Sequence, residues 1–114
     1  MLNISVVHLL KQTQTNNIME VANTILQQLG GNKFLVMTGS KNLRAGKNKL
    51  VMDLTRNKLG AKFLTIELDA MDTYTMTFQS MRKWEIKTKA EIKGVYCDQL
   101  QSIFTQQTGL YTHL

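Results

Sequence analysis

The spacing of apolar residues changes along the chain from a helical period to a strand period. In residues 17–29 the apolar positions form one continuous stripe, made of Ile18, Val21, Ala22, Ile25, Leu26 and Leu29. Spacing by three and four residues predicts an amphipathic helix. Asn17 is a candidate N-cap, and Glu20 three residues later completes a capping-box pattern. Gly30 and Gly31 are expected to stop this helix.

Beyond the two glycines the pattern takes a period of two, which predicts strands. The first strand is short and largely apolar, and the four that follow alternate apolar with polar side chains. We expect strands over residues 33–39, 49–54, 61–68, 72–78 and 83–93. The linkers between them are short and turn-like, as in a meander of hairpins. Such alternation is typical of an antiparallel sheet with one solvent-exposed face.

The alternation also assigns side chains to the two faces of the sheet. In residues 61–68, Leu64 and Ile66 are expected to point inward and Phe63 outward. The last strand alternates most strictly, with apolar residues opposing lysines and glutamates; its apolar positions are Trp84, Ile86, Ala90 and Ile92. This pattern predicts that Trp84 belongs to the core.

A second helix is expected over residues 96–108, with an apolar stripe of Leu100, Ile103 and Phe104 and with Gly109 ending it. The N-terminal ISVVHLL fits either a short helix or an extra edge strand. The order of elements predicts the α+β class, in the form of an antiparallel sheet of four to five strands (a meander) flanked by an N-terminal and a C-terminal helix.

Positive charge is concentrated in one part of the chain. The 114 residues carry a formal net charge of +6, and residues 33–62 hold eight basic residues against the single acid Asp53. The candidate binding residues in and beside the expected hairpin are Lys41, Arg44, Lys47, Lys49, Arg56, Lys58, Lys62 and Phe63. Such a basic hairpin could follow a nucleic-acid backbone or contact an acidic protein surface. The alternative is that the lysines only keep the protein soluble and block pairing between sheet edges.

Aromatic residues near this hairpin extend the nucleic-acid hypothesis. An outward Phe63, together with Trp84 or Tyr74 if either is exposed, could provide a platform on which unpaired bases stack.

The other chemistry-bearing residues do not form a recognisable site. His8 and His113 lie at opposite ends of the chain, and Cys97 has no ligand-spaced companion, so we expect no metal. We interpret Cys97 as a small buried residue at the start of a helix. Asp69 and Asp72 fall in a turn, where aspartate commonly bonds its own backbone. We therefore expect a protein that is not an enzyme and has no cofactor.

The glycines near residue 40 do not make a phosphate-binding motif, because a strand rather than a helix is expected to follow them. A single cysteine cannot form an internal disulfide, which favours a reducing compartment. The N-terminus lacks a basic start and a cleavage site, and nothing approaches the apolar length of a membrane span. These features predict a cytoplasmic protein with no membrane association.

Three segments, residues 24–42, 54–68 and 96–114, resemble a family of small uncharacterised bacteriophage and prophage proteins. The resemblance runs from about residue 22 to the end of the chain. It implies a phage origin and action in the cytoplasm of a bacterial host, and it implies no catalytic residue, cofactor or substrate. Residues 1–15 look like a variable leader, which leaves residues 16–114 as a single α+β domain.

Together these observations predict a small, non-enzymatic, phage-encoded protein that binds nucleic acid or an acidic protein surface through its basic hairpin. The alternative is a structural or assembly module that forms a homo-oligomer or a component of the phage particle.

Overall fold

The structure, a computed structural model, describes residues 20–111. The first described element is a helix, α1, whose described part is 20–29. The elements that follow are α2 (Gly31–Thr38), β1 (Lys41–Gly46), β2 (Lys49–Asp53), β3 (Phe63–Leu68), β4 (Tyr74–Arg82), β5 (Glu85–Val95), a 3-10 turn (Cys97–Gln99) and α3 (Leu100–Thr108).

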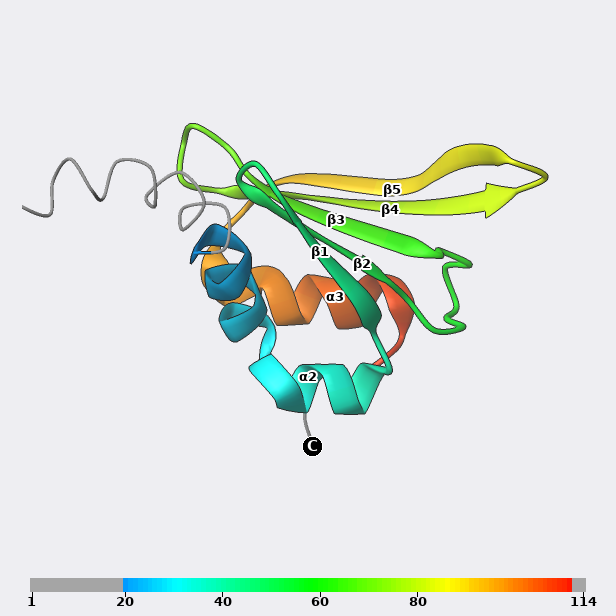
Figure 1. Cartoon of the computed structure of the whole chain (residues 1–114), viewed down its shortest axis with the longest axis horizontal. Coiled ribbons are helices and arrows are strands. Elements are labelled where there is room, and N and C mark those ends of the chain that lie inside the picture. The colour runs from blue at the N-terminus through cyan, green and yellow to red at the C-terminus, as the bar shows by residue number, and fades with distance from the viewer. Residues whose placement is uncertain (1–19, 112–114) are drawn as a thin grey trace, which may run out of the picture.

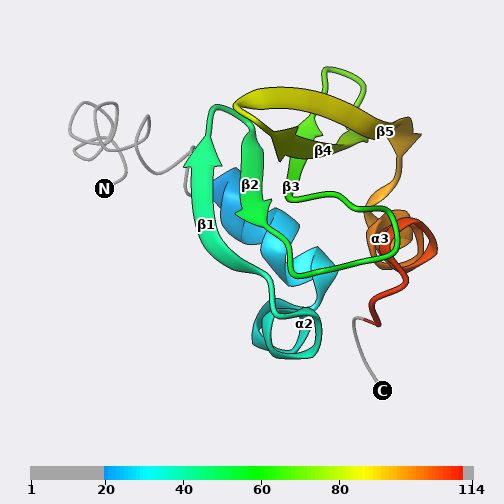
Figure 2. The same ribbon diagram turned by 90° about the vertical axis from the view of Figure 1, so that its right-hand side faces the viewer.

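The five strands form one antiparallel sheet in the order β1-β2-β3-β4-β5, so each strand pairs with its neighbour in sequence (Figure 1). Figures 1 and 2 show the helices together on one face of the sheet, with α2 in the position furthest from it. The opposite face is uncovered by any described helix. This arrangement confirms the α+β class and the meander.

The core lies between the sheet and the helices and is centred on three phenylalanines. Phe104 of α3 packs edge-on against Phe34 of α2, with ring centroids 5.0 Å apart, and lies 6.5 Å from Phe78 of β4. All three rings are fully buried. The side chains that enclose them come from α1 and from the inward positions of the strands and α3: Ile25, Leu29, Met52, Leu64, Ile66, Met76, Val95 and Leu100.

The strand expected over residues 33–39 is wrong, because this segment is the helix α2. Its buried residues, Gly31, Phe34 and Thr38, recur at helical spacing. Gly30 does end α1, and its N–H bonds to carbonyls of that helix. At φ 124° it then turns the chain directly into a second helix instead of into the sheet. A short apolar run fits a buried helix or a strand equally well, so the periodicity of residues 33–39 does not distinguish the two structures.

The linker expected before the 49–54 strand is also corrected, since it contains β1. Residues 41–46 pair antiparallel with β2 through a two-residue turn at Lys47 and Asn48. Asn48 has φ 56°, a conformation that asparagine tolerates better than most residues. The basic segment is therefore a true hairpin, although its first strand lies later in the chain than expected.

Strands β2 and β3 and the inward faces of β2 to β4 follow the prediction, although β4 runs on to Arg82. In β5, which covers Glu85–Val95 and not 83–93, the inward assignment of Ile86 is wrong: its side chain is 55% exposed, because it lies where the hairpin extends beyond β3. Leu64 and Ile66 are buried in β3, and Phe63 lies on the outward face, half-buried. The assignment of Trp84 to the core is wrong, because its side chain is 92% exposed. The alternation was read through residues 83 and 84, which form the turn between β4 and β5 instead of belonging to a strand.

The C-terminal helix is confirmed in outline. Residues 97–99 form a 3-10 turn, and α3 continues to Thr108, where Gly109 in a left-handed conformation donates its N–H to the carbonyl of Thr105. Cys97 is exposed, so the expectation that it is buried is wrong. The expected leader 1–15, ISVVHLL, the Asn17 cap and both histidines lie outside the described residues. Within residues 20–111 no helix has the length and apolarity needed to span a membrane.

Candidate functional site

Exposed positive charge gathers at one end of the sheet, which we call the basic end. It is built from two segments, the β2–β3 loop (residues 54–62) and residues 82–89 of the β4–β5 hairpin. Its exposed cationic residues are Arg56, Lys58, Lys62, Arg82, Lys83, Lys87 and Lys89. Glu85 is the only carboxylate in these two segments, so the local net charge is +6. In the part of the chain that the structure describes, none of these seven side chains forms a salt bridge.

The β2–β3 loop is ordered by the side-chain amide of Asn57. Its Nδ2 donates to the carbonyls of Thr55 and Ala61, at 2.7 and 2.8 Å. Its Oδ1 accepts from the backbone N–H groups of Leu59 and Ala61, both at 3.2 Å. One side chain therefore bonds four backbone groups of a loop that has no regular secondary structure, and it fixes the path along which Arg56, Lys58 and Lys62 are displayed.

Contacts to neighbouring elements fix where this loop lies. The N–H of Lys58 donates to the carbonyl of Thr108 at the end of α3, at 3.1 Å. The N–H of Lys62 donates to the carbonyl of Gln79 on β4, at 2.7 Å. A Cβ placed on Gly60 would lie 4.0 Å from Cε of Lys89, so the Lys89 side chain reaches the β2–β3 loop.

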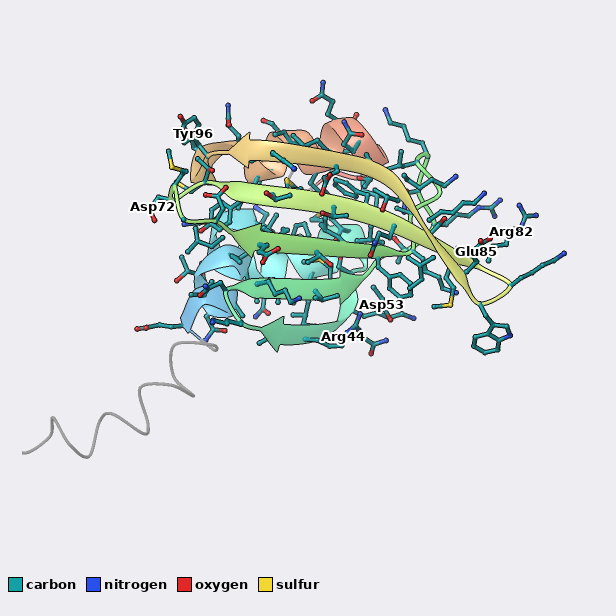
Figure 3. All side chains as sticks on the ribbon, turned by 90° about the horizontal axis from the view of Figure 1, so that it is seen from above. Arg44, Asp53, Asp72, Arg82, Glu85 and Tyr96 are labelled. Carbon is teal, nitrogen blue, oxygen red and sulfur yellow. The ribbon has the colours of Figure 1, made fainter. Side chains whose placement is uncertain are left out.

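The β4–β5 hairpin projects past the rest of the sheet (Figure 1). The last pair between β3 and β4 is Phe63 with Gln79, whereas β4 and β5 remain paired as far as Arg82 and Glu85. Residues 80–87 thus have no third strand beside them. Figure 3 shows Arg82 and Glu85 at its tip.

Arg44, one of the predicted binding residues, is held by neighbouring groups on β1 and β2. Its Nη2 lies 3.1 Å from Oδ1 of Asp53, and its Nη1 donates to the carbonyl of Asn42 at 2.7 Å. Asn42 in turn donates to Oδ2 of Asp53 at 2.8 Å. The hydrogen bond from Asn42, followed by the interactions with Arg44, lowers the pKa of Asp53. Asn42 has φ 54°, and an irregularity interrupts the β1–β2 pairing between Lys41 and Arg44. The hydrogen bonds among Asn42, Arg44 and Asp53 therefore lie at this irregularity.

The other predicted residues do not all meet in one place. Lys47 and Lys49 lie at the end of the sheet opposite to the basic end, and Lys49 pairs across strands with Glu67. Asp72 lies at that same opposite end (Figure 3). Lys41 is the strand partner of Asp53 in the β1–β2 ladder, so it lies at the end of β2 that leads into the β2–β3 loop.

Of the three aromatic residues suggested as a stacking platform, Trp84 is exposed, Phe63 is half-buried and Tyr74 is buried. Phe63 follows Lys62 and stays half-buried on the outward face, opposite Gln79. Tyr74 is 5% exposed and belongs to the core, so it cannot stack on a ligand. Its burial raises the pKa of its hydroxyl.

The β3–β4 turn is organised by Asp69, as the sequence predicts. Its Oδ1 accepts from the N–H groups of Met71 and Thr73, and its Oδ2 accepts from the Thr73 hydroxyl at 2.6 Å. That hydroxyl contact is the largest cause of the lowered pKa of Asp69.

Within residues 20–111 no three His, Cys, Asp or Glu side chains group as a metal site would require.

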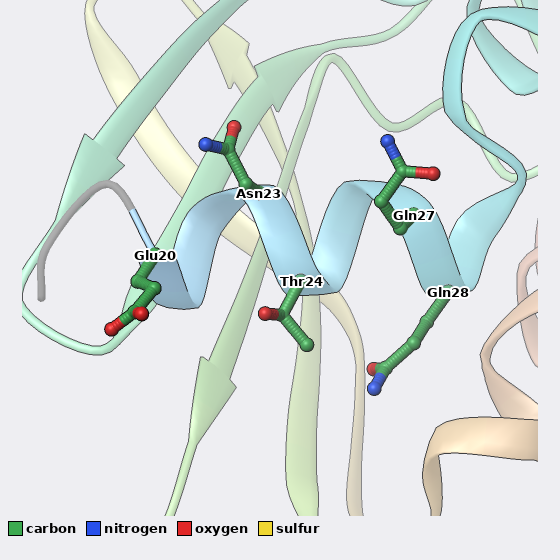
Figure 4. A pocket seen from close by; sticks show the side chains of 5 residues that line it. All are labelled: Glu20, Asn23, Thr24, Gln27 and Gln28. Atoms are coloured by element: carbon green, nitrogen blue, oxygen red, sulfur yellow. The ribbon is translucent and has the colours of Figure 1, made fainter. Parts of the chain in front are cut away.

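Shallow hollows on the described surface include two whose linings bear on the site. One, of about 360 Å³, lies in the β2–β3 loop and includes Arg56 and Lys62 in its lining, so it belongs to the basic end. The other, of about 380 Å³, lies along α1 (Figure 4). Its lining consists of Glu20, Asn23, Thr24, Gln27 and Gln28. These side chains offer neither cations nor aromatic rings, so this hollow adds nothing to the basic end.

The sequence interpretation identified half of the basic end and missed the other half. Arg56, Lys58 and Lys62 are among the predicted binding residues, whereas Lys83, Lys87 and Lys89 are predicted only as the polar face of a strand, and Arg82 lies outside every predicted element. The four basic residues within residues 82–89 could have indicated a second part of the site. Their proximity to the β2–β3 loop, however, depends on the register of β3, β4 and β5.

Comparison with protein-family models, with curated proteins and with solved structures returned no match. The site is therefore interpreted from its own geometry.

Proposed function

We propose that this protein binds nucleic acid through the basic end, in a non-enzymatic role. The observation that carries the proposal is the convergence of seven exposed cations from two chain segments on one end of a rigid sheet. Phosphate groups are the ligands that such a surface attracts, and each neutralised phosphate releases bound counterions. A phage-encoded protein in the bacterial cytoplasm, as the resemblance implies, would meet DNA and RNA there.

The geometry supports the basic end over the hairpin that the sequence suggested. Arg44 is already engaged by Asp53 and Asn42, and Lys49 lies opposite Glu67. The side chains at the basic end are exposed, and their backbones are held by the hydrogen bonds of the β2–β3 loop and by the β4–β5 ladder. A preorganised charged surface loses less conformational entropy when it binds a polyanion.

The test is fluorescence anisotropy of labelled oligonucleotides against the purified protein over a range of salt concentrations. If all seven cations contact phosphate, the slope of log K against log salt reaches about −5 for a single strand, at roughly −0.7 for each contact. The double variant Lys62→Gln/Lys89→Gln should make that slope shallower by about 1.4 and weaken binding.

The matched control is Lys47→Gln/Lys93→Gln. It removes the same charge from two exposed lysines at the opposite end of the sheet. We expect it to leave the slope nearly unchanged. If the two double variants lost the same affinity and salt dependence, net charge alone would drive binding, and this would contradict a localised site. No binding at low salt would reject the proposal and would favour an acidic protein partner for these cations.

The assembly alternative has less support from the sheet edges. β1 is short and carries a bulge, and β5 carries two pairing irregularities together with exposed lysines. Bulges and edge lysines are the usual means by which a sheet avoids pairing with another copy. A concentration-dependent dimer in sedimentation measurements, together with no oligonucleotide binding, would reverse this preference.

A further inference from the structure

The tip of the β4–β5 hairpin carries a feature that phosphate binding alone does not require. Three pairs extend beyond β3: Ser80 with Lys87, Met81 with Ile86, and Arg82 with Glu85. At about 3.3 Å per residue, this two-stranded finger reaches about 10 Å past the last β3–β4 pair. Its tip is Lys83 followed by Trp84.

The tip holds the chain's only tryptophan in an exposed and costly position. Trp84 is 92% exposed, although tryptophan is usually well buried. Lys83 and Trp84 both have positive φ, at 52° and 68°, as the central residues of a type I′ hairpin turn do. Asparagine and glycine adopt this conformation readily, whereas a bulky residue with positive φ is an outlier. A strained turn that displays a tryptophan points to a role in contact with a ligand.

The surroundings of Trp84 favour a nucleobase over a lipid surface as that ligand. Arg82, Lys83 and Glu85 flank the indole, so inserting the tip into a bilayer would carry three charges with it. Stacking on a base instead leaves those charges in water or beside phosphate. Lys87 and Lys89 then continue the positive surface from the finger back to the β2–β3 loop.

We propose that the ligand is single-stranded nucleic acid and that Trp84 stacks on an unpaired base while the basic end binds the adjacent phosphates. The inference rests on the proposed function and adds the class of nucleic acid and the residue that selects it. Bases in a duplex already stack on one another and leave no free face for the indole, whereas every unpaired base offers one.

The single tryptophan makes the test direct. Fluorescence of the full chain is followed while an oligothymidine of about 15 nucleotides, or a duplex of the same length, is added. We expect the single strand to quench Trp84 and the duplex to quench it much less. Trp84→Leu should weaken single-strand binding by roughly 5- to 150-fold, the effect of losing one base–aromatic stack, and Trp84→Phe should retain most of the affinity. Met71→Ala, which removes another exposed apolar side chain from a different turn, is the control and should bind normally.

A second variant separates stacking from the geometry of the turn. Trp84→Gly installs a residue that a type I′ turn prefers and keeps Lys83 of the basic end. We expect its melting temperature to rise, which shows that the hairpin is intact, while single-strand affinity falls at least as far as in Trp84→Leu.

The outcomes separate this inference from the proposed function. If the oligonucleotide binds by anisotropy but neither quenches Trp84 nor distinguishes Trp84→Leu, the stacking inference fails and the proposed function stands. Equal quenching by the duplex overturns the preference for single strands. If no oligonucleotide binds at low salt, both fail. A blue shift of Trp84 with vesicles of anionic phospholipid, without any response to oligonucleotides, overturns the inference in favour of a membrane surface.

Discussion

Replacing Asn57 by alanine tests whether the β2–β3 loop must be ordered for the basic end to bind. The residue carries no charge and is half-buried, and its amide makes four hydrogen bonds to the backbone of its own loop. The substitution therefore removes the loop's organising contacts without altering the net charge. A change in oligonucleotide binding then reports on the positions of the cations.

The expected loss of stability follows from those contacts. A hydrogen bond contributes about 0.5–1.5 kcal/mol net, so four give about 2–6 kcal/mol. Water reaches part of this surface loop and can replace some of the bonds, whereas Ala61, which supplies two of the four backbone partners, is only 5% exposed. We therefore expect a loss of about 2–3 kcal/mol in the free energy of unfolding, and a melting temperature lower by about 10 °C.

Urea unfolding and anisotropy on the same preparations measure both effects. Asn57→Ala should weaken oligonucleotide binding and flatten its salt dependence, because Arg56, Lys58 and Lys62 lose their fixed positions. Asn57→Asp is the companion variant. Its Oδ1 still accepts from Leu59 and Ala61, but its second oxygen faces the carbonyls of Thr55 and Ala61 without a donor.

Asn57→Asp should therefore destabilise the fold at neutral pH, where the added carboxylate is charged. If Asn57→Ala lost less than about 0.5 kcal/mol and bound normally, the loop would not depend on its amide, and the link from loop order to binding would be refuted.

Two further predictions concern the fold. Phe104→Ala should cost about 3–5 kcal/mol in urea unfolding, because the ring is fully buried against Phe34 and Phe78; a loss below about 1 kcal/mol would contradict that packing. Asp69 has a pKa below its ordinary value of 3.8 in the folded state, so its stabilising contribution is full above 3.8 and is lost as pH falls through the lower folded value. Melting temperatures across that range should fall with acid, and Thr73→Ala should make the fall shallower; an unchanged slope would remove Thr73 as the cause.

Prediction from the sequence failed at two kinds of position. Residues 33–39 are largely apolar, so neither period stands out; the structure has a helix there, which follows the turn at Gly30 and buries Phe34 against Phe104 of α3. At Trp84 the alternation continued across a turn, because a type I′ turn occupies two residues and keeps the register of a strand pattern. The usual asparagine and glycine are absent from this turn, so no local signal marked it.

The sequence by itself determined the approximate positions of strands β2 to β5, the inward faces of β2 to β4, the C-terminal helix with its glycine stop, and an excess of positive charge. These are local properties, since side-chain period and turn chemistry depend on near neighbours in the chain. Only the tertiary structure decided which charges lie together. Strand pairing places Lys62 beside β4 and brings residues 82–89 to the same end of the sheet. It also brings Arg44 within salt-bridge distance of Asp53. The physical reason is that a binding surface is made by residues far apart in sequence, and register fixes their distances.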